Sequence, residues 1–231
     1  MTDIASTTAG LMQERLRDLP RQLREARLAI GLCLAAASAI LGGCLTLHVA
    51  RDVPFRALMQ DPTAYLGGQA YVGVVSQLGI MIWVAAAATC LFGAFIAHRA
   101  GRSGARFLLA SGALSGFLGA DDLLQLHEDI LPLAGVPQTA VLACYAALGL
   151  AYLAAFRRDI LALNPVLLAL SCGFLGLSLA IDLVFAHGDV QTFAEDGAKL
   201  VGILFWGAFF VVSAATICDP QGRGNGSLWK A

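Results

Sequence analysis

The sequence predicts an all-α integral membrane protein, a bundle of six transmembrane helices with both chain termini in the cytoplasm. Composition is the first observation behind this prediction. Of the 231 residues, 58% are hydrophobic and only 13% are charged, whereas soluble domains carry about 25% charged residues. The second observation is that the apolar residues gather in runs of about 20, the length that an α-helix needs to cross a bilayer. The third is an uneven distribution of Lys and Arg along the chain.

Six apolar segments follow one another. Their predicted bounds are 28–49, 72–97, 106–126, 138–156, 165–186 and 195–217. The polar or Gly/Pro-containing segments that separate them are Arg51–Gly68, His98–Ala105, Glu128–Pro137, Arg157–Pro165 and His187–Ala194. None of these connections is long enough for a soluble domain. We therefore expect three parts, which are a cytoplasmic amphipathic or interfacial arm (1–27), a transmembrane domain (28–217) and a flexible cytoplasmic tail (218–231).

The basic residues give the orientation. Twelve of the fifteen Lys and Arg flank the spans on one side of the predicted membrane: Arg15, Arg17, Arg21, Arg24, Arg27, Arg99, Arg102, Arg106, Arg157, Arg158, Arg223 and Lys230. Arg51 and Arg56 lie on the other side, and Lys199 lies inside the last span. Cytoplasmic loops carry the excess of Lys and Arg. This predicts cytoplasmic termini and, since no organelle signal is present, a bacterial inner membrane in contact with the lipid bilayer.

Polar residues concentrate at the opposite, periplasmic ends of the predicted spans. They are His48, Asp121, Asp122, His127, Glu128, Asp129, Asp182, His187, Glu195 and Asp196. Ionisable groups at membrane depth are costly unless they are paired, hydrated or bound to a metal, so they mark functional sites. The sequence therefore predicts a periplasm-side acidic and histidine-containing pocket that binds a cation or a polar head group.

The segment 121–129 (DDLLQLHED) carries the densest part of this pattern. On a helix, Asp121 and Glu128 share a stripe, whereas His127 lies about 120° away from it. A break near Leu126 or a second helix is needed to bring these groups together. Three preceding glycines, Gly112, Gly116 and Gly119, have the small-residue spacing that lets another helix approach closely.

Lys199 lies one turn inside the last span, where an unpaired ammonium group is costly. We expect a buried ion pair with Glu195, with Asp196 or with an acid from the third span. Two carboxylates near one lysine leave surplus negative charge, which protons, water or a divalent cation must balance.

Several functions remain open for these residues. Carboxylates and imidazoles together suit a divalent metal such as zinc, manganese or iron. The candidate metal ligands are Asp121, Asp122, His127, Glu128, His187 and Glu195. In a metal-dependent membrane enzyme acting on a small molecule or lipid, metal-bound water would be the nucleophile, Glu128 or Glu195 the general base, and Lys199 an electrostatic partner of the transition state.

Other roles compete with the metal site. The acids could simply end helices in interfacial water. A proton-coupled transporter could pass protons along Asp121, Glu195 and Lys199. An accessory subunit could dock on a larger membrane protein, or on further copies of this chain, through Gly/Ala-rich helix faces. No nucleic-acid-binding patch is present in the sequence.

Two segments carry a resemblance. ADDLLQLHEDILP (120–132), taken together with AEDGAKLVGILFW (194–206), looks most like small bacterial polytopic membrane proteins of unassigned function. The resemblance covers the third to sixth spans and implies no activity. The microbial rhodopsins, which have seven spans, and the membrane hydrolases that include alkaline ceramidases, which have a paired histidine motif in the last span, fit these residues less well.

Overall fold

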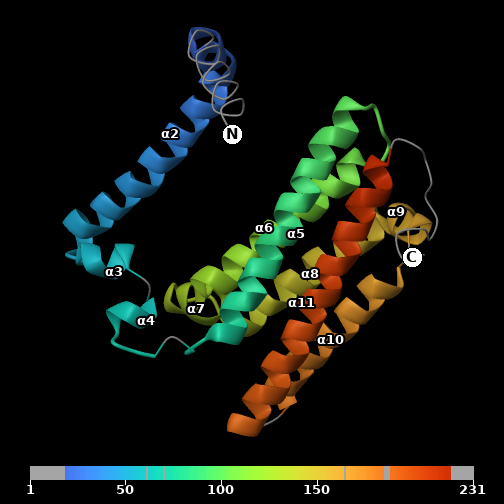
Figure 1. Cartoon of the computed structure of the whole chain (residues 1–231). Coiled ribbons are helices and arrows are strands. Elements are labelled where there is room, and N and C mark those ends of the chain that lie inside the picture. The colour runs from blue at the N-terminus through green and yellow to red at the C-terminus, as the bar shows by residue number, and fades with distance from the viewer. Residues whose placement is uncertain (1–18, 61, 70, 164, 185–187, 220–231) are drawn as a thin grey trace, which may run out of the picture. The chain divides into compact units, whose positions relative to one another are not determined.

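A computed structural model describes residues 19–60, 62–69, 71–163, 165–184 and 188–219, and every regular element in these residues is a helix (Figure 1). This confirms the all-α class. The chain divides into two compact units, residues 1–72 and 73–231. The predicted arm before residue 19 and the predicted tail after residue 219 lie outside the described residues.

The first unit contains the long helix α2 (Leu19–Arg51) and two short helices, α3 (Phe55–Met59) and α4 (Pro62–Tyr65). Helix α2 includes the first predicted span, and Ala37–Arg51 is a shorter apolar stretch within it. The ring of His48 stacks on Phe55 at 4.0 Å between centroids, and its Nδ1 lies 2.9 Å from the carbonyl oxygen of Val53. His48 thus helps to hold the turn after α2 within its own unit.

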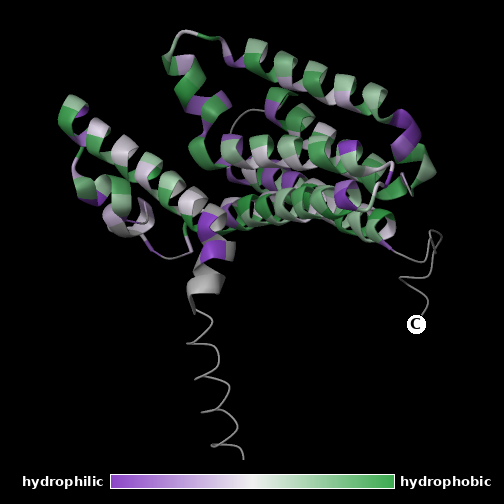
Figure 2. Ribbon diagram, turned by 90° about the horizontal axis from the view of Figure 1, so that it is seen from above, coloured by the Kyte–Doolittle hydropathy of each residue, from purple (hydrophilic) through white to green (hydrophobic). Residues whose placement is uncertain are grey.

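The second unit contains five helices that are long and apolar enough to cross a membrane, which indicates a multi-pass membrane protein. They are α5 (Val74–Arg99), α6 (Ala105–Leu124), α8 (Gln138–Ala155), α10 (Val166–Val184) and α11 (Asp189–Cys218). Their bounds confirm the second to sixth predicted segments to within a few residues, except that α11 begins earlier than predicted. Hydrophobic residues occupy most of the length of these five helices (Figure 2).

Shorter helices connect these long ones. A π-helix, η1 (Leu126–Ile130), and α7 (Leu131–Leu133) lie between α6 and α8, and α9 (Arg157–Ala162) lies between α8 and α10. Within this unit α5 packs on α6, α10 packs on α11, and α11 packs on α5. We call the end where α6 finishes and α11 begins the acidic end, and the end where α5 finishes and α6 begins the basic end.

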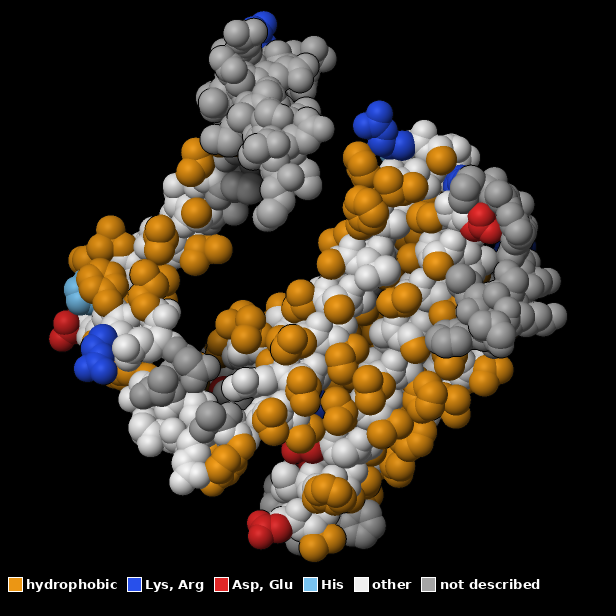
Figure 3. Space-filling view, in the orientation of Figure 1, with side chains coloured by type: hydrophobic (Ala, Val, Ile, Leu, Met, Phe, Trp, Pro, Cys, Tyr) orange, Lys and Arg blue, Asp and Glu red, His pale blue; other side chains and the backbone are white. Residues whose placement is uncertain are grey.

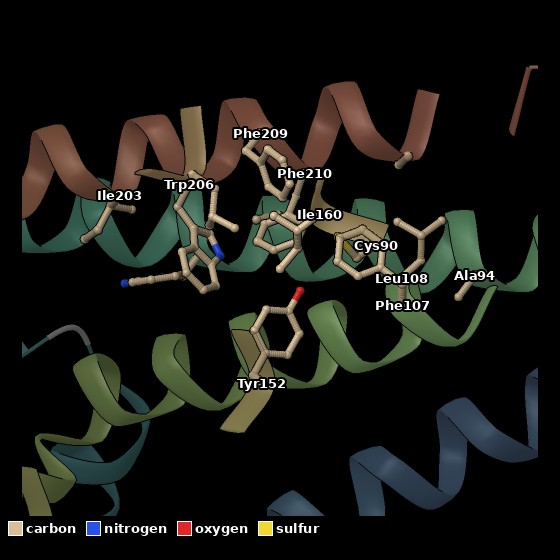
Figure 4. Packing of buried hydrophobic residues seen from close by; sticks show 14 residues of the cluster. Cys90, Ala94, Phe107, Leu108, Tyr152, Ile160, Ile203, Trp206, Phe209 and Phe210 are labelled. Carbon is tan, nitrogen blue, oxygen red and sulfur yellow. The ribbon is translucent and has the colours of Figure 1, made fainter. Parts of the chain in front are cut away.

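An aromatic cluster fills the space between these helices. Figure 4 shows Phe209 and Phe210 of α11 near Phe107 of α6, and Tyr152 reaching in from α8. Trp206, also of α11, packs against Phe210. Two of the cluster's polar atoms have partners, because Trp206 donates Nε1–H to the hydroxyl of Ser115 at 2.9 Å and the hydroxyls of Ser111 and Tyr152 lie 2.6 Å apart. Such bonds satisfy polar groups where no water is available.

Glycines allow α5 and α6 to approach closely. A Cβ atom on Gly112 would lie 2.7 Å from Cγ of Leu91, and one on Gly119 would lie 2.9 Å from Cβ of Trp83. Gly116 has more room, because its nearest neighbour, Cβ of Ala87, would be at 3.7 Å. The predicted close approach of another helix to this glycine series is therefore confirmed, and that helix is α5.

Candidate functional site

The end of α6 is broken next to Leu126, which is one of the two arrangements that the sequence allowed for gathering the polar groups. After Leu124, Gln125 adopts the left-handed conformation (φ 51°, ψ 44°), and the chain continues as the π-helix η1. A non-glycine residue with positive φ is uncommon, and π-helical turns occur frequently at functional sites. The break turns His127 back toward Asp121, which a continuous α-helix could not do.

Asp121 is buried and is fully engaged by hydrogen bonds (3% exposed). One carboxylate oxygen, Oδ1, accepts from the backbone N–H of His127 at 3.2 Å and from the hydroxyl of Tyr145 at 2.8 Å. The other, Oδ2, lies 2.5 Å from Nδ1 of His127, which donates to it when it carries the proton. Asp121 therefore fixes the position and the tautomer of the imidazole.

Asp122 points to different partners. Its Oδ1 accepts from the ammonium group of Lys199 at 2.9 Å, and its Oδ2 accepts from the indole N–H of Trp83, also at 2.9 Å. The expected ion pair of Lys199 is confirmed, and its partner is the acid from the third predicted span. Because Lys199 belongs to α11 and Trp83 to α5, Asp122 ties three helices together.

A small cavity adjoins this ion pair. It has a volume of about 30 Å³ and is lined by Val75, Ser76, Gly79, Asp122, Asp196, Lys199, Leu200 and Ile203. One water molecule needs at least about 10–15 Å³ by this measure. The cavity therefore has room for a water molecule or a small ion, and none for a metabolite.

His127 and Glu128 complete the group. The Nε2 atom of His127 lies 3.4 Å from Oε1 of Glu128, whose side chain is 48% exposed. Hydrogen bonding to Glu128 raises the pKa of His127 above its usual range, with the charge of Asp121 acting in the same direction and burial opposing both. The same interaction with His127, supported by the charge of Lys199, lowers the pKa of Glu128.

We refer to these seven side chains as the polar cluster: Trp83, Asp121, Asp122, His127, Glu128, Tyr145 and Lys199. They come from α5, α6, η1, α8 and α11. The sequence indicated five of the seven side chains and did not single out Trp83 or Tyr145. The signal for Tyr145 was weak, since it is one of two tyrosines on a largely apolar helix.

Other predicted residues lie apart from this cluster. Glu195 accepts from the side-chain amide of Gln191 on its own helix at 2.5 Å, and no described contact joins it to Asp121 or His127. Asp129 is exposed. His187 lies outside the described residues, so its predicted role as a ligand is not placed. Among the residues described, no group of three or more His, Cys, Asp or Glu side chains is arranged to hold a metal.

Charge is distributed very unevenly between the two ends of the second unit (Figure 3). The acidic end carries Asp121, Asp122, Glu128, Asp129, Asp182, Asp189, Glu195 and Asp196. Against them, the described residues at this end supply one lysine, Lys199, which also lies within electrostatic reach of Glu128 and Asp196. The basic end carries Arg99, Arg102, Arg106, Arg157 and Arg158.

A larger cavity, of about 470 Å³, lies at the basic end beside Arg102, Asp159 and Thr216. Arg102 donates Nη1–H to the carbonyl oxygens of Ile217 and Asp219, at 2.7 and 2.5 Å. A basic side chain commonly satisfies the last carbonyl groups of a helix in this way. Arg102 therefore caps the C-terminal end of α11. The side chains of the polar cluster lie at the other end of the unit.

One protein-family model matches residues 27–213, and its description is "Domain of unknown function (DUF8692)". The matched region contains the whole polar cluster and all five of the long apolar helices of the second unit except the last residues of α11. No curated protein and no solved structure matches the chain. The function is therefore argued from the geometry of the polar cluster.

Proposed function

We propose that this chain, which belongs to the family DUF8692, is a multi-pass protein of a bacterial inner membrane. Its periplasmic, acidic pocket binds a cation. The observation that carries the proposal is the unbalanced set of carboxylates at the acidic end of the second unit. A membrane protein retains buried or half-buried charges when they handle an ion or a proton.

The membrane topology follows from charge. In the described part of the second unit, arginines lie at the basic end, and the acidic end has Lys199 as its only Lys or Arg. The positive-inside rule puts the basic end in the cytoplasm and the polar cluster on the periplasmic side. With α2 as a sixth span, both termini are cytoplasmic, as the basic residues Arg24 and Arg27 also favour.

Electrostatics favours a cation over an anion. Four carboxylates, those of Asp121, Asp122, Glu128 and Asp196, face two positive groups, the ammonium of Lys199 and the imidazole of His127 in its protonated form. Two negative charges therefore stay unbalanced in the polar cluster and its cavity. Like charges held this close repel each other unless protons or cations accumulate. The small volume next to Asp122 and Asp196 restricts the ligand at that point to water or a bare ion.

Cation binding can be measured by isothermal titration of the purified full chain in detergent, with Na⁺, Ca²⁺, Mn²⁺ and Zn²⁺ tested separately. We expect saturable binding of at least one ion. Asp196→Asn or Glu128→Gln should weaken it at least fivefold. Asp159→Asn, which removes an acid at the basic end, is the matched control and should leave the affinity unchanged. Absence of saturable binding for all four ions would overturn the proposal.

Proton-coupled transport is the second candidate, and the Asp122–Lys199 ion pair is the observation that favours it. This pair lies between three helices, where a change in the protonation of either partner would alter helix packing. In proteoliposomes with an imposed pH gradient, a transporter should give a cation flux that Asp122→Asn abolishes. Saturable cation binding with no flux under any gradient would rule out transport and leave cation binding as the proposed function.

A further inference from the structure

The two adjacent aspartates of the polar cluster are already occupied. Asp121 accepts three hydrogen bonds and Asp122 accepts two, so each of their four oxygen atoms has a partner. A metal ion at either carboxylate would have to displace buried donors and leave them unpaired, which is costly. A metal ion that does not compete with these donors would use other atoms of the cluster.

Two atoms of the cluster, Nε2 of His127 and Oε1 of Glu128, have only each other as partners, and a metal ion between them would take the place of the proton that they share when His127 is charged. When Nδ1 of His127 donates to Asp121, Nε2 carries the free lone pair that a metal requires. Oε1 of Glu128 lies 3.4 Å from this nitrogen. Zinc binds histidine nitrogen and carboxylate oxygen at about 2.0–2.2 Å, and two such ligands at a tetrahedral angle lie about 3.4 Å apart.

We propose that a divalent transition-metal ion, with Zn²⁺ as the reference case, binds between Nε2 of His127 and Oε1 of Glu128, while Asp121 acts as a positioning residue. This inference rests on the proposed function and names the ion class and the ligands. A metal-bound histidine almost always donates its other ring N–H to a carboxylate, a carbonyl group or water, which fixes the ring and raises its basicity. The Asp121–His127 contact has this arrangement, and Tyr145 holds Asp121 from α8.

The site is open. The described residues supply two protein ligands, so water or a polar head group must complete the coordination of the ion. The half-exposed side chain of Glu128 places those open positions on the accessible side of the cluster, whereas His127 is 15% exposed. Catalytic and substrate-binding metal sites keep such positions free, and structural zinc sites do not. A ligand with a phosphate or carboxylate group would fit, because Lys199 lies within electrostatic reach of Glu128.

The test is a Zn²⁺ titration of the full chain in detergent, in competition with a chromophoric chelator. We expect one bound ion per chain. Glu128→Gln and His127→Gln should each weaken binding at least tenfold, and Asp121→Asn should weaken it about 10–100-fold, the usual effect of removing a partner of a metal-bound histidine. Asp129→Asn removes the neighbouring acid and serves as the matched control, with an affinity within about threefold of the unchanged chain.

A spectroscopic measurement separates ligation from folding. X-ray absorption of the Zn²⁺-loaded protein should show one imidazole and oxygen ligands, and the imidazole signal should be lost in His127→Gln, with the helical circular dichroism unchanged. If His127→Gln fails to fold, Glu128→Gln, at a half-exposed side chain, decides the question.

Three outcomes overturn the inference. Zinc affinity that survives both His127→Gln and Glu128→Gln but falls in Asp196→Asn moves the ion to the cavity beside Lys199, and the proposed function then stands. Saturable binding of Na⁺ or Ca²⁺ without binding of Zn²⁺ would likewise overturn this inference and leave the proposed function standing. Absence of binding for every cation removes both proposals.

Discussion

Asp122 is a half-buried carboxylate that forms an ion pair with Lys199. Replacing Lys199 with Met keeps much of the apolar stem but leaves Asp122 with the indole N–H of Trp83 alone. Removing one partner of a fully buried pair costs about 3–5 kcal/mol, and we expect about 1–3 kcal/mol here because Lys199 is one-third exposed. Thermal unfolding of the purified protein checks this. The double variant Asp122→Asn/Lys199→Met should recover most of the loss; an additive loss would contradict the pairing.

His127 and Glu128 give the stability a pH dependence with a defined sign. The pKa of His127 is raised from 6.5, so its contribution is complete below pH 6.5 and is lost as the pH rises through the raised value. The pKa of Glu128 is lowered from 4.5, so its contribution is present above pH 4.5 and is lost as the pH falls through the lowered value. Both side chains are therefore charged, and their interaction is complete, between pH 4.5 and pH 6.5.

The measurement is the melting temperature of the unchanged chain and of His127→Gln, both in buffer with a chelator. The difference between the two proteins should be larger at pH 5.5 than at pH 9. The hydrogen bond to Asp121 should keep part of the difference at pH 9, because neutral histidine can still donate from Nδ1. A difference that grows with pH would contradict the assigned interaction.

The break between α6 and η1 brings His127 to Asp121, and Gln125 adopts the left-handed conformation at this break. The left-handed conformation of Gln125 costs a residue with a side chain roughly 1–2 kcal/mol. Glycine adopts this conformation without such a cost. Gln125→Gly should therefore leave stability unchanged or raise it, whereas Gln125→Val should lower it by about 1–2 kcal/mol. Chemical unfolding of both variants measures the difference. Equal stability would show that the chain continues as a regular helix at this point.

The contact between α5 and α6 offers a matched pair of glycines. Gly112→Ala would place Cβ 2.7 Å from the side chain of Leu91 and 3.1 Å from its backbone nitrogen, so the helices must move apart. We expect a loss of about 1–3 kcal/mol. Gly116→Ala meets ordinary van der Waals contact at 3.7 Å and should be neutral or slightly stabilising. The two melting temperatures, compared in the same detergent, check the pair; similar losses would argue against this packing.

The same helix pair shows how far the sequence could predict the site. The acidic end and the glycine series were visible in the sequence, and helix geometry required either a break near Leu126 or a second helix. Trp83 was not visible, because its role depends on the register of α5 against α6. Once Leu91 faces Gly112 and Trp83 faces Gly119, the antiparallel register carries the indole to Asp122. A single sequence does not reveal how α5 is aligned along α6, and it does not show which of the two adjacent aspartates forms the ion pair with the lysine.

At the scale of the whole molecule, the proposed topology puts the two ends of each long helix on opposite sides of a membrane. Asp129 belongs to η1 at the acidic end, and Ser103 belongs to the loop between α5 and α6 at the basic end. Cysteines introduced at these exposed positions report the side on which each end lies. The native cysteines first need to be replaced, since Cys144 and Cys172 are themselves exposed.

In intact bacterial spheroplasts, a membrane-impermeant maleimide should label Asp129→Cys, and should label Ser103→Cys only after the membrane is permeabilised. The reason is the distribution of basic residues: the opposite orientation would put the five arginines of the basic end in the periplasm, against the positive-inside rule. The reverse labelling pattern would place the polar cluster in the cytoplasm. It would then meet cytoplasmic metal ions and substrates, and the cation proposed for Glu128 would have to be sought on that side.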